Sequence, residues 1–148
     1  MFPMPTHEET RRLPFQPLQL FDLVADIGRY PEFLPWCKGA RIIKRQDNIV
    51  TADLIIGYKM FQERFTSVVV LDRPKAISVK YLSGPLAHLT NDWEFRPVGK
   101  NGCDLYFHVD FDFRSHILGN IMAIFFEKAI GRMASAFEER ARELYGRI

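Results

Sequence analysis

Three side chains that could ligate a metal stand at alternate positions near residue 110. His108, Asp110 and Asp112 are two residues apart, so in an extended strand their side chains share one face. The residues that alternate with them are apolar, which predicts that the three lie on the hydrated side of the strand. We therefore expect an ordinary solvated face here and assign no metal site.

Acid–base catalysis needs a carboxylate or histidine in a dry site that shifts its pKa. Asp92 and Glu94 flank Trp93, so they point away from the interior if the indole points inward. Asp53 stands in the same relation to its apolar neighbours. An enzyme would then depend on Tyr58 or on loop residues, and the chain has no nucleophile elbow, phosphate loop or zinc-type spacing. We predict no catalytic residue and no enzyme activity.

The composition is that of a compact protein with a sizeable core. Of 148 residues 47% are apolar, including 13 phenylalanines, and 26% are charged, which excludes an intrinsically disordered chain. The net charge is only +2, so the strong basic field of a DNA-binding protein is missing. A chain of this length predicts one domain over 1–148.

Three features bear on where the protein works. Cys37 and Cys103 stand far apart without a pairing pattern, which favours free thiols in a reducing compartment. The segment 1–12 lacks the apolar centre of a signal peptide, and the longest apolar run, 117–126, is about half a membrane span. We expect a cytoplasmic protein, peripheral to the inner membrane of a bacterium or on the matrix side of a mitochondrion, that does not cross the bilayer.

The period of the apolar residues divides the chain into elements. Residues 6–13 suit a charged edge strand, and residues 17–27 have apolar side chains at helical spacing, followed by at most one more helical turn. From residue 40 onwards the period is two, with turn-forming residues between the segments. The predicted strands of this region are 40–46, 50–58, 63–72, 76–82, 89–95 and 104–113.

The last predicted strand shows its two faces most clearly. Its odd-numbered residues from Leu105 to Phe113 are all apolar, and its even-numbered residues are polar or tipped by a hydroxyl, an alternation typical of a sheet that is dry on one side. A helix capped by Ser115 is predicted to follow, to about Tyr145. The order of strand, short helices, antiparallel meander and long helix predicts an α+β fold in which the curved sheet buries its dry face against that helix.

The predicted terminal helix is apolar on two sides. The stripe that should face the sheet consists of Leu118, Met122, Phe126, Ala129, Met133, Phe137 and Leu144. Ile117, Ile121 and Ile124 project on the opposite side, with Lys128 one turn further on. An outward apolar patch of this kind marks a contact site. Three candidates could cover this patch: an anionic membrane surface, the loop 81–89, or a second copy of the chain.

A curved sheet that grips a helix often leaves space at its wide end, which suits a hydrophobic ligand. The candidate ligand-binding residues are Tyr58, Phe65, Val79, Trp93, Phe107, Val109, Phe111, Met122, Phe125 and Ala129. Nearly all are apolar, with a few polar tips that could orient a ligand. A core filled completely by side chains is the alternative.

Two stretches carry a resemblance to a known family. The segment YPEFLPWCKGARI at 30–42 and the terminal helix ILGNIMAIFFEKAIGRMASAFEERA at 117–141, joined by the meander, resemble the START-like superfamily. The similarity is to its polyketide cyclase/dehydrase-like branch, which includes the coenzyme Q-binding proteins, and it covers essentially the whole chain. The resemblance implies a helix-grip (START/Bet v 1-like) fold whose cavity binds ubiquinone or a related isoprenoid lipid, with no separate cofactor. It also implies a role beside the proteins of respiration or of coenzyme Q biosynthesis, with a polyketide cyclase-type enzyme as an alternative.

The same branch is similar to bacterial ribosome-association toxins, which implies the ribosome as an alternative partner. Lys38, Arg41, Lys44 and Arg45 form a basic cluster that could contact lipid phosphates or ribosomal RNA, or simply edge a solvated strand. We predict a carrier that binds ubiquinone or a similar lipid and docks on an anionic membrane. No DNA partner is expected.

Overall fold

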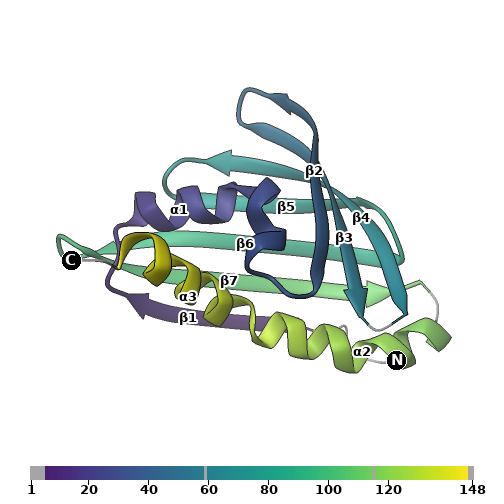
Figure 1. Cartoon of the computed structure of the whole chain (residues 1–148). Helices are drawn as coiled ribbons and strands as arrows, with labels where there is room; N and C mark the ends of the chain where they lie inside the picture. The colour runs from purple at the N-terminus through teal and green to yellow at the C-terminus, as the bar shows by residue number, and fades with distance from the viewer. Residues whose placement is uncertain (1–5, 59, 115, 147–148) are drawn as a thin grey trace.

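The computed structural model describes residues 6–58, 60–114 and 116–146 and, within these ranges, the side chains other than those of 58, 61 and 116–123. Seven strands form one curved sheet that wraps around the helices (Figure 1). In chain order the elements are β1 (Thr6–Leu13), α1 (Pro17–Ala25), the 3₁₀ helix η1 (Ile27–Glu32), β2 (Cys37–Gln46), β3 (Ile49–Tyr58), β4 (Phe61–Asp72), β5 (Ala76–Ser83), β6 (Leu86–Val98), β7 (Gly102–Phe113), α2 (His116–Gly131) and α3 (Met133–Tyr145).

Neighbouring strands of the sheet are all antiparallel, in the order β1-β7-β6-β5-β4-β3-β2. Strands β2 to β7 therefore form a meander, and the first strand is added beside the last. β1 pairs with β7 along its whole length, from Thr6 opposite Asp110 to Leu13 opposite Cys103. The predicted α+β fold, with an edge strand, a six-stranded meander and C-terminal helices against the sheet, is confirmed.

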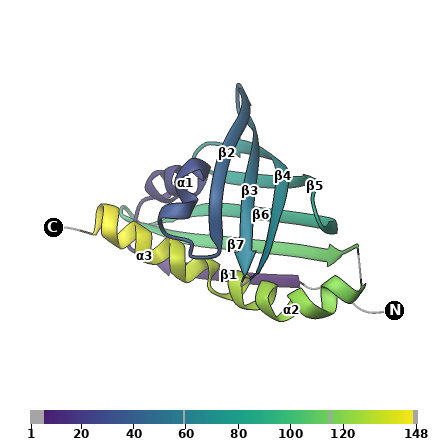
Figure 2. The same ribbon diagram turned by 45° about the vertical axis from the view of Figure 1, so that its right-hand side comes forward.

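The inner face of the sheet is dry, as the alternation in β7 predicts. Leu105, Phe107, Val109 and Phe111 are all buried, and the even-numbered residues between them keep part of their surface in water. Figures 1 and 2 show the helices on the inner side of the curved sheet. The apolar core of the molecule lies between these two layers.

The short helix α1 covers one end of the inner face. Pro17 stands in its first turn, where a missing N–H leaves no hydrogen bond unmade. Phe21 is buried and meets Phe95 of β6 edge to face, with ring centroids 5.5 Å apart. The helix ends at Ala25, slightly before the predicted end, and η1 continues the chain towards β2.

The C-terminal helix is interrupted, which corrects the prediction of one helix to Tyr145. α2 ends at Gly131, and α3 begins after Arg132. The backbone N–H of Arg132 is shared between the carbonyls of Lys128 and Ala129, at 3.1 and 3.2 Å, a mixed pattern that tightens the turn. Glycine is also a poor helix former. The helix can therefore change direction at this point and follow the curved sheet.

The predicted inward stripe is wrong at Leu144, which is 50% exposed. On α3 the buried residues are centred between Phe137 and Ala141. At the last turn the inward side is occupied by Tyr145, which packs on Phe15 with ring centroids 6.3 Å apart. At 100° per residue Leu144 lies only about 20° around the helix from Phe137, but on the flank away from Ala141 and Tyr145, so at the last turn it reaches water.

Candidate functional site

A cavity of about 170 Å³ lies between the inner face of the sheet and the helices. Strands β3 to β7 supply most of its wall, α2 and α3 cover it, and α1 with the segment up to β2 forms one end. Its described lining residues are almost all apolar, and none is charged. The space is therefore suited to a neutral, hydrophobic molecule.

Most of the predicted ligand-binding residues lie in this wall. They are Phe65, Val79, Trp93, Phe107, Val109, Phe125 and Ala129. Phe111 is not part of the wall; its buried ring packs against that of Phe126, with ring centroids 5.6 Å apart, and Phe126 lines the cavity. The side chains of Tyr58 and Met122 lie outside the described residues. Contact of any of these residues with a ligand stays a prediction.

Sequence reasoning missed one end of the cavity. Tyr30, Leu34, Trp36 and Cys37 line it from η1 and the segment that follows. This segment has no regular period because prolines interrupt it, so a search for alternation could not assign it an inward side. The signal that could have found it is the density of aromatic residues in the segment 30–37.

Ser67 of β4 also lines the cavity, and the sequence reasoning missed it as well. It alternates with Phe65 and Val69, which are buried on the inner face. The spacing therefore indicates an inward position, although a serine is more often found on a hydrated face.

The larger polar side chains of the wall are hydrogen bonded within the protein. The Asn91 side-chain amide donates to the carbonyl of His108 at 2.8 Å, and its oxygen accepts from the Trp93 indole N–H at 2.9 Å. The Tyr30 hydroxyl donates to the carbonyl of Val24. These bonds fix the side chains in place and leave the wall weakly polar.

Burial also keeps the titratable groups of the wall neutral. It raises the pKa of the Tyr30 hydroxyl and the pKa of the Cys37 thiol, which donates to the carbonyl of Gly39 at 3.4 Å. A group whose pKa is raised in this way carries no charge near neutral pH. The described wall thus has no acid or base poised to transfer a proton at neutral pH.

Aromatic rings close the cavity on its helix side. Phe126 of α2 lies between Phe65 of β4 and Phe111 of β7, with ring centroids 5.7 and 5.6 Å away. Phe137 of α3 meets Trp93 edge to face at 5.1 Å. Both halves of the interrupted helix are therefore held against the sheet by ring contacts.

Among its described residues, α2 exposes one large apolar side chain, that of Ile124, together with the charged side chains of Glu127 and Lys128. Ile124 is 64% exposed, so the loop 81–89 does not cover it, and that explanation is wrong for this residue. Lys128 is exposed one turn further on. The ends of β3 and β4 lie near α2 in Figures 1 and 2, and Met60, between these two strands in the chain, is 96% exposed. The side chains of Ile117 and Ile121 lie outside the described residues. Of the helices that the structure describes, none could span a bilayer.

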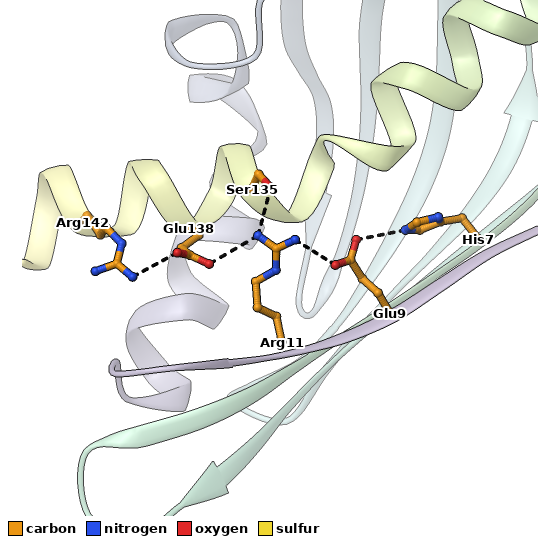
Figure 3. A network of polar contacts seen from close by, with 6 residues as sticks. All are labelled: His7, Glu9, Arg11, Ser135, Glu138 and Arg142. Carbon is orange, nitrogen blue, oxygen red and sulfur yellow. Dashed lines mark hydrogen bonds and ion pairs between the residues drawn. The ribbon is translucent and has the colours of Figure 1, made fainter.

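A chain of polar contacts fastens α3 to the edge strand β1 (Figure 3). Its members are His7, Glu9, Arg11, Ser135, Glu138 and Arg142. Arg11 donates to Ser135 at 2.9 Å, to Glu138 at 3.3 Å and to Glu9 at 3.0 Å. Partial burial acts to raise the pKa of Glu9, but hydrogen bonds from His7 and Arg11 outweigh it and lower the pKa below its usual value. The network therefore holds α3 in place. The exposed Ile124 lies on α2, before the break in the helix.

The candidate metal ligands lie on the outer face of β7, where each is engaged in polar contacts of its own or with a neighbour. Asp110 accepts a hydrogen bond from Thr6 at 2.5 Å, and its other oxygen lies 3.3 Å from Nε2 of His108. Asp112 accepts from the backbone N–H of Phe113 at 2.9 Å. Within the described residues no three such side chains come together in a way that could hold a metal ion.

The outer face of β3 contains a buried carboxylate. Asp53 lies opposite the cavity, as predicted, but it is only 5% exposed. Its oxygens accept from Thr66 at 2.5 Å and from Arg41 at 3.2 Å. The pairing satisfies the carboxylate in a structural role, away from the ligand space.

The basic cluster lies along β2 at the far edge of the sheet. Lys38, Arg41, Lys44 and Arg45 are all exposed. Arg41 is partly neutralised by Asp53, and Lys38 donates to the carbonyl of Pro35 at 3.0 Å. Lys44 and Arg45 therefore offer the least restrained charges of the cluster.

Comparison with known proteins now decides the family. A family model described as "Polyketide cyclase / dehydrase and lipid transport" matches residues 13–138, which span α1, the meander, α2 and the first part of α3. The chain belongs to this family. Its fold matches a START superfamily protein from Mycobacterium smegmatis with a TM-score of 0.80, at 17% sequence identity over 94% of this chain and 98% of that one. The predicted START-like, helix-grip fold is thereby confirmed.

Two relatives within this family have different names. "Ribosome association toxin RatA" from Rickettsia prowazekii is 37% identical over 145 residues, which are 95% of this chain and 99% of the relative. "Coenzyme Q-binding protein COQ10 homolog B, mitochondrial" from Xenopus laevis is 31% identical over 146 residues, 95% of this chain and 59% of the relative. The family thus includes proteins named for a lipid and proteins named for the ribosome.

Proposed function

We propose that this protein binds ubiquinone or a related isoprenoid quinone in the cavity of its START-like lipid-binding fold and carries it without covalent change. The observation that carries the proposal is the uncharged, apolar wall. A charged ligand buried there would lack a partner, whereas a quinone is neutral. The Xenopus relative named for coenzyme Q binding supports the choice of ligand. Such a carrier would supply respiratory enzymes or coenzyme Q biosynthesis.

The volume of the cavity limits which part of the ligand it holds. At about 170 Å³ it is close to the roughly 150 Å³ apolar cavity engineered in another protein, which binds benzene. One substituted ring therefore fits, and a long polyisoprenoid tail does not. We expect the ring to bind inside and the tail to leave near α2, where apolar side chains reach the surface.

Fluorescence quenching tests ring binding directly, because Trp93 and Trp36 both line the cavity. Quinones accept excitation from indoles, so titration with a short-tailed ubiquinone should quench the emission in a saturable way. A variant with the cavity narrowed, Ala52→Leu, is the matched control because the added atoms point into the same space. Equal quenching in both proteins, without saturation, would show that the quinone does not bind there.

The proposed carrier must meet a membrane, and we assign that contact to the outward side of α2. Ile124 and Met60 are exposed apolar side chains at this end of the molecule, and Lys128 adds a positive charge. This combination is typical of docking on anionic lipids. For Ile124 the other cover still open is a second copy of the chain.

Liposome co-sedimentation tests the membrane contact with a matched pair of variants. Ile124→Asp should weaken binding to anionic vesicles, and the melting temperature should stay nearly unchanged because the side chain is already exposed. Ile43→Asp changes an isoleucine of β2 that is 49% exposed at the opposite edge of the sheet, and it should bind vesicles as the wild type does. Equal behaviour of the two variants would refute the assignment to α2.

Ribosome association is the second candidate function. The Rickettsia relative is named for it, and β2 exposes Lys44 and Arg45 with little restraint from neighbouring acids. Basic side chains on an exposed strand suit contact with RNA phosphates. This function would use the edge of the sheet and leave the cavity free.

Salt dependence of ribosome binding tests this candidate. If four phosphate contacts are made, the affinity should fall with salt with a log–log slope of about −3. Changing Lys38, Arg41, Lys44 and Arg45 to glutamine should abolish both the binding and the slope. The control changes Lys75 and Lys100, which are exposed in turns, and should have little effect. A loss of the same size in the control would point to net charge alone.

A further inference from the structure

Ser67 is the polar side chain of the cavity wall whose hydroxyl is left unused. It stands between Phe65 and Val69 on β4 and faces Ala52 of β3 and Tyr81 of β5 in the sheet. Among the described residues the Ser67 hydroxyl makes no hydrogen bond. It also keeps some accessible surface, because the one fully buried side-chain nitrogen or oxygen without a hydrogen-bond partner among those residues is Nε of Arg140. The hydroxyl is therefore available to a molecule in the cavity.

The local backbone supports this orientation. The pairing of β4 with β5 is irregular between Thr66 and Ser67: Thr66 lies opposite Ser83, and Ser67 lies opposite Tyr81. The partner strand thus has one extra residue at this point. Irregularities of this kind re-aim side chains and recur beside functional sites.

The other polar groups of the wall already have partners. Asn91 and Trp93 are bonded to each other, Tyr30 donates to a backbone carbonyl, and Cys37 does the same. They shape the cavity, but their principal hydrogen-bonding groups are occupied. Ser67 is accordingly the group with the greatest freedom to distinguish one apolar ligand from another.

The absence of charge in the described wall decides what the hydroxyl can recognise. A carboxylate in this space would meet one hydroxyl and no cation, which does not replace its lost hydration. A hydrocarbon would leave the hydroxyl without a partner. A neutral carbonyl oxygen accepts one hydrogen bond and carries no charge, so it matches the site in both respects.

We propose that the Ser67 hydroxyl donates a hydrogen bond to a carbonyl oxygen of the bound ring, so that the cavity selects neutral carbonyl-bearing rings over hydrocarbons and carboxylates of equal size. This inference rests on the proposed binding of a quinone-like ligand in the cavity. To that function it adds a residue that determines specificity, Ser67, and the chemical group that this residue recognises, a carbonyl oxygen.

Three probes and two variants test the inference on the full chain. The probes are 2,3-dimethoxy-5-methyl-1,4-benzoquinone, the hydrocarbon tetramethylbenzene and a methyl-substituted benzoate, measured by tryptophan quenching or by displacement of the quinone. Ser67→Ala removes only the oxygen and should weaken quinone binding about three- to tenfold, with hydrocarbon binding unchanged or tighter. Ser67→Thr retains the hydroxyl and should restore quinone affinity to within about twofold of the wild type. The benzoate should bind at least about tenfold more weakly than the quinone to the wild type.

The possible results distinguish failure of ligand binding in the cavity from failure of the role assigned to Ser67. If the wild type binds quinone and hydrocarbon and Ser67→Ala weakens both equally or neither, the role of Ser67 is refuted and the cavity remains a ligand site. Benzoate binding as tight as quinone binding also refutes the proposed selection. If the wild type binds none of the three probes, the proposed function fails first and this inference fails with it.

Discussion

Replacing Ala52 by leucine tests whether the cavity is open space or a filled core. Ala52 is 3% exposed and lines the cavity from β3. Leucine adds three carbon atoms, and burial of each contributes about 0.8 kcal/mol, so occupation of empty volume should raise the free energy of unfolding by up to about 2.4 kcal/mol. The same addition to a filled core would lower it by about 1–3 kcal/mol. The sign of the change therefore distinguishes the two.

Thermal and urea unfolding measure this sign. For a chain of this size 1 kcal/mol corresponds to about 2–4 °C in melting temperature, so Ala52→Leu should leave Tm unchanged or raise it by up to about 10 °C. Ala141→Leu is the matched control, because Ala141 is fully buried on α3 and does not line the cavity. It should lower Tm by overpacking. If both variants lose stability to a similar extent, the cavity is not available space and the reasoning from its volume is wrong.

Three further predictions concern packing, acid stability and thiol reactivity. Phe137→Ala should lower the free energy of unfolding in urea by about 3–5 kcal/mol, since the ring is buried among aromatic neighbours; a loss below about 1 kcal/mol would contradict this packing. Because the pKa of Glu9 is lowered in the folded protein from its usual 4.5, its contribution to stability is present above that pH and is lost as pH falls through the folded value. Glu9→Gln should therefore reduce the loss of stability against urea that the wild type shows as pH falls below about 4.5, and parallel pH curves for the two proteins would argue against it. Burial raises the pKa of the Cys37 thiol, and raises that of Cys103 to about 11, so neither should react with a thiol reagent at neutral pH until denaturant is added; fast labelling of the native protein would show that one is accessible.

The strands were predictable because one repeated pattern specifies them. Along β7 every second residue from Leu105 to Phe113 is apolar, and a sheet with one dry face requires that period. The same pattern assigned Phe65, Trp93 and Phe107 to the cavity side. It could not show that Phe111 lies outside the wall, because the depth of a residue along an inner face depends on the curvature of the whole sheet.

The remaining parts of the site depend on information that alternation does not contain. Tyr30 and Trp36 line the cavity from a proline-interrupted segment without a period. Ser67 occupies an inward position that its own polarity argues against. The break after Gly131 is a local loss of helix geometry, and the continuous apolar stripe of the sequence conceals it. In each case tertiary packing overrides the local pattern.

β2 forms one border of the sheet, so its outer backbone N–H and C=O groups could pair with the same strand of another molecule. Lys44 and Arg45 on this strand repel a second copy approaching side by side. Neutralising them would therefore favour fibrous or amorphous self-association, quite apart from any contact with RNA. With glutamate in place of Lys44 and Arg45, the β2 edges of two molecules still repel each other. A glutamate variant therefore distinguishes self-association of the protein from the loss of a ribosomal contact.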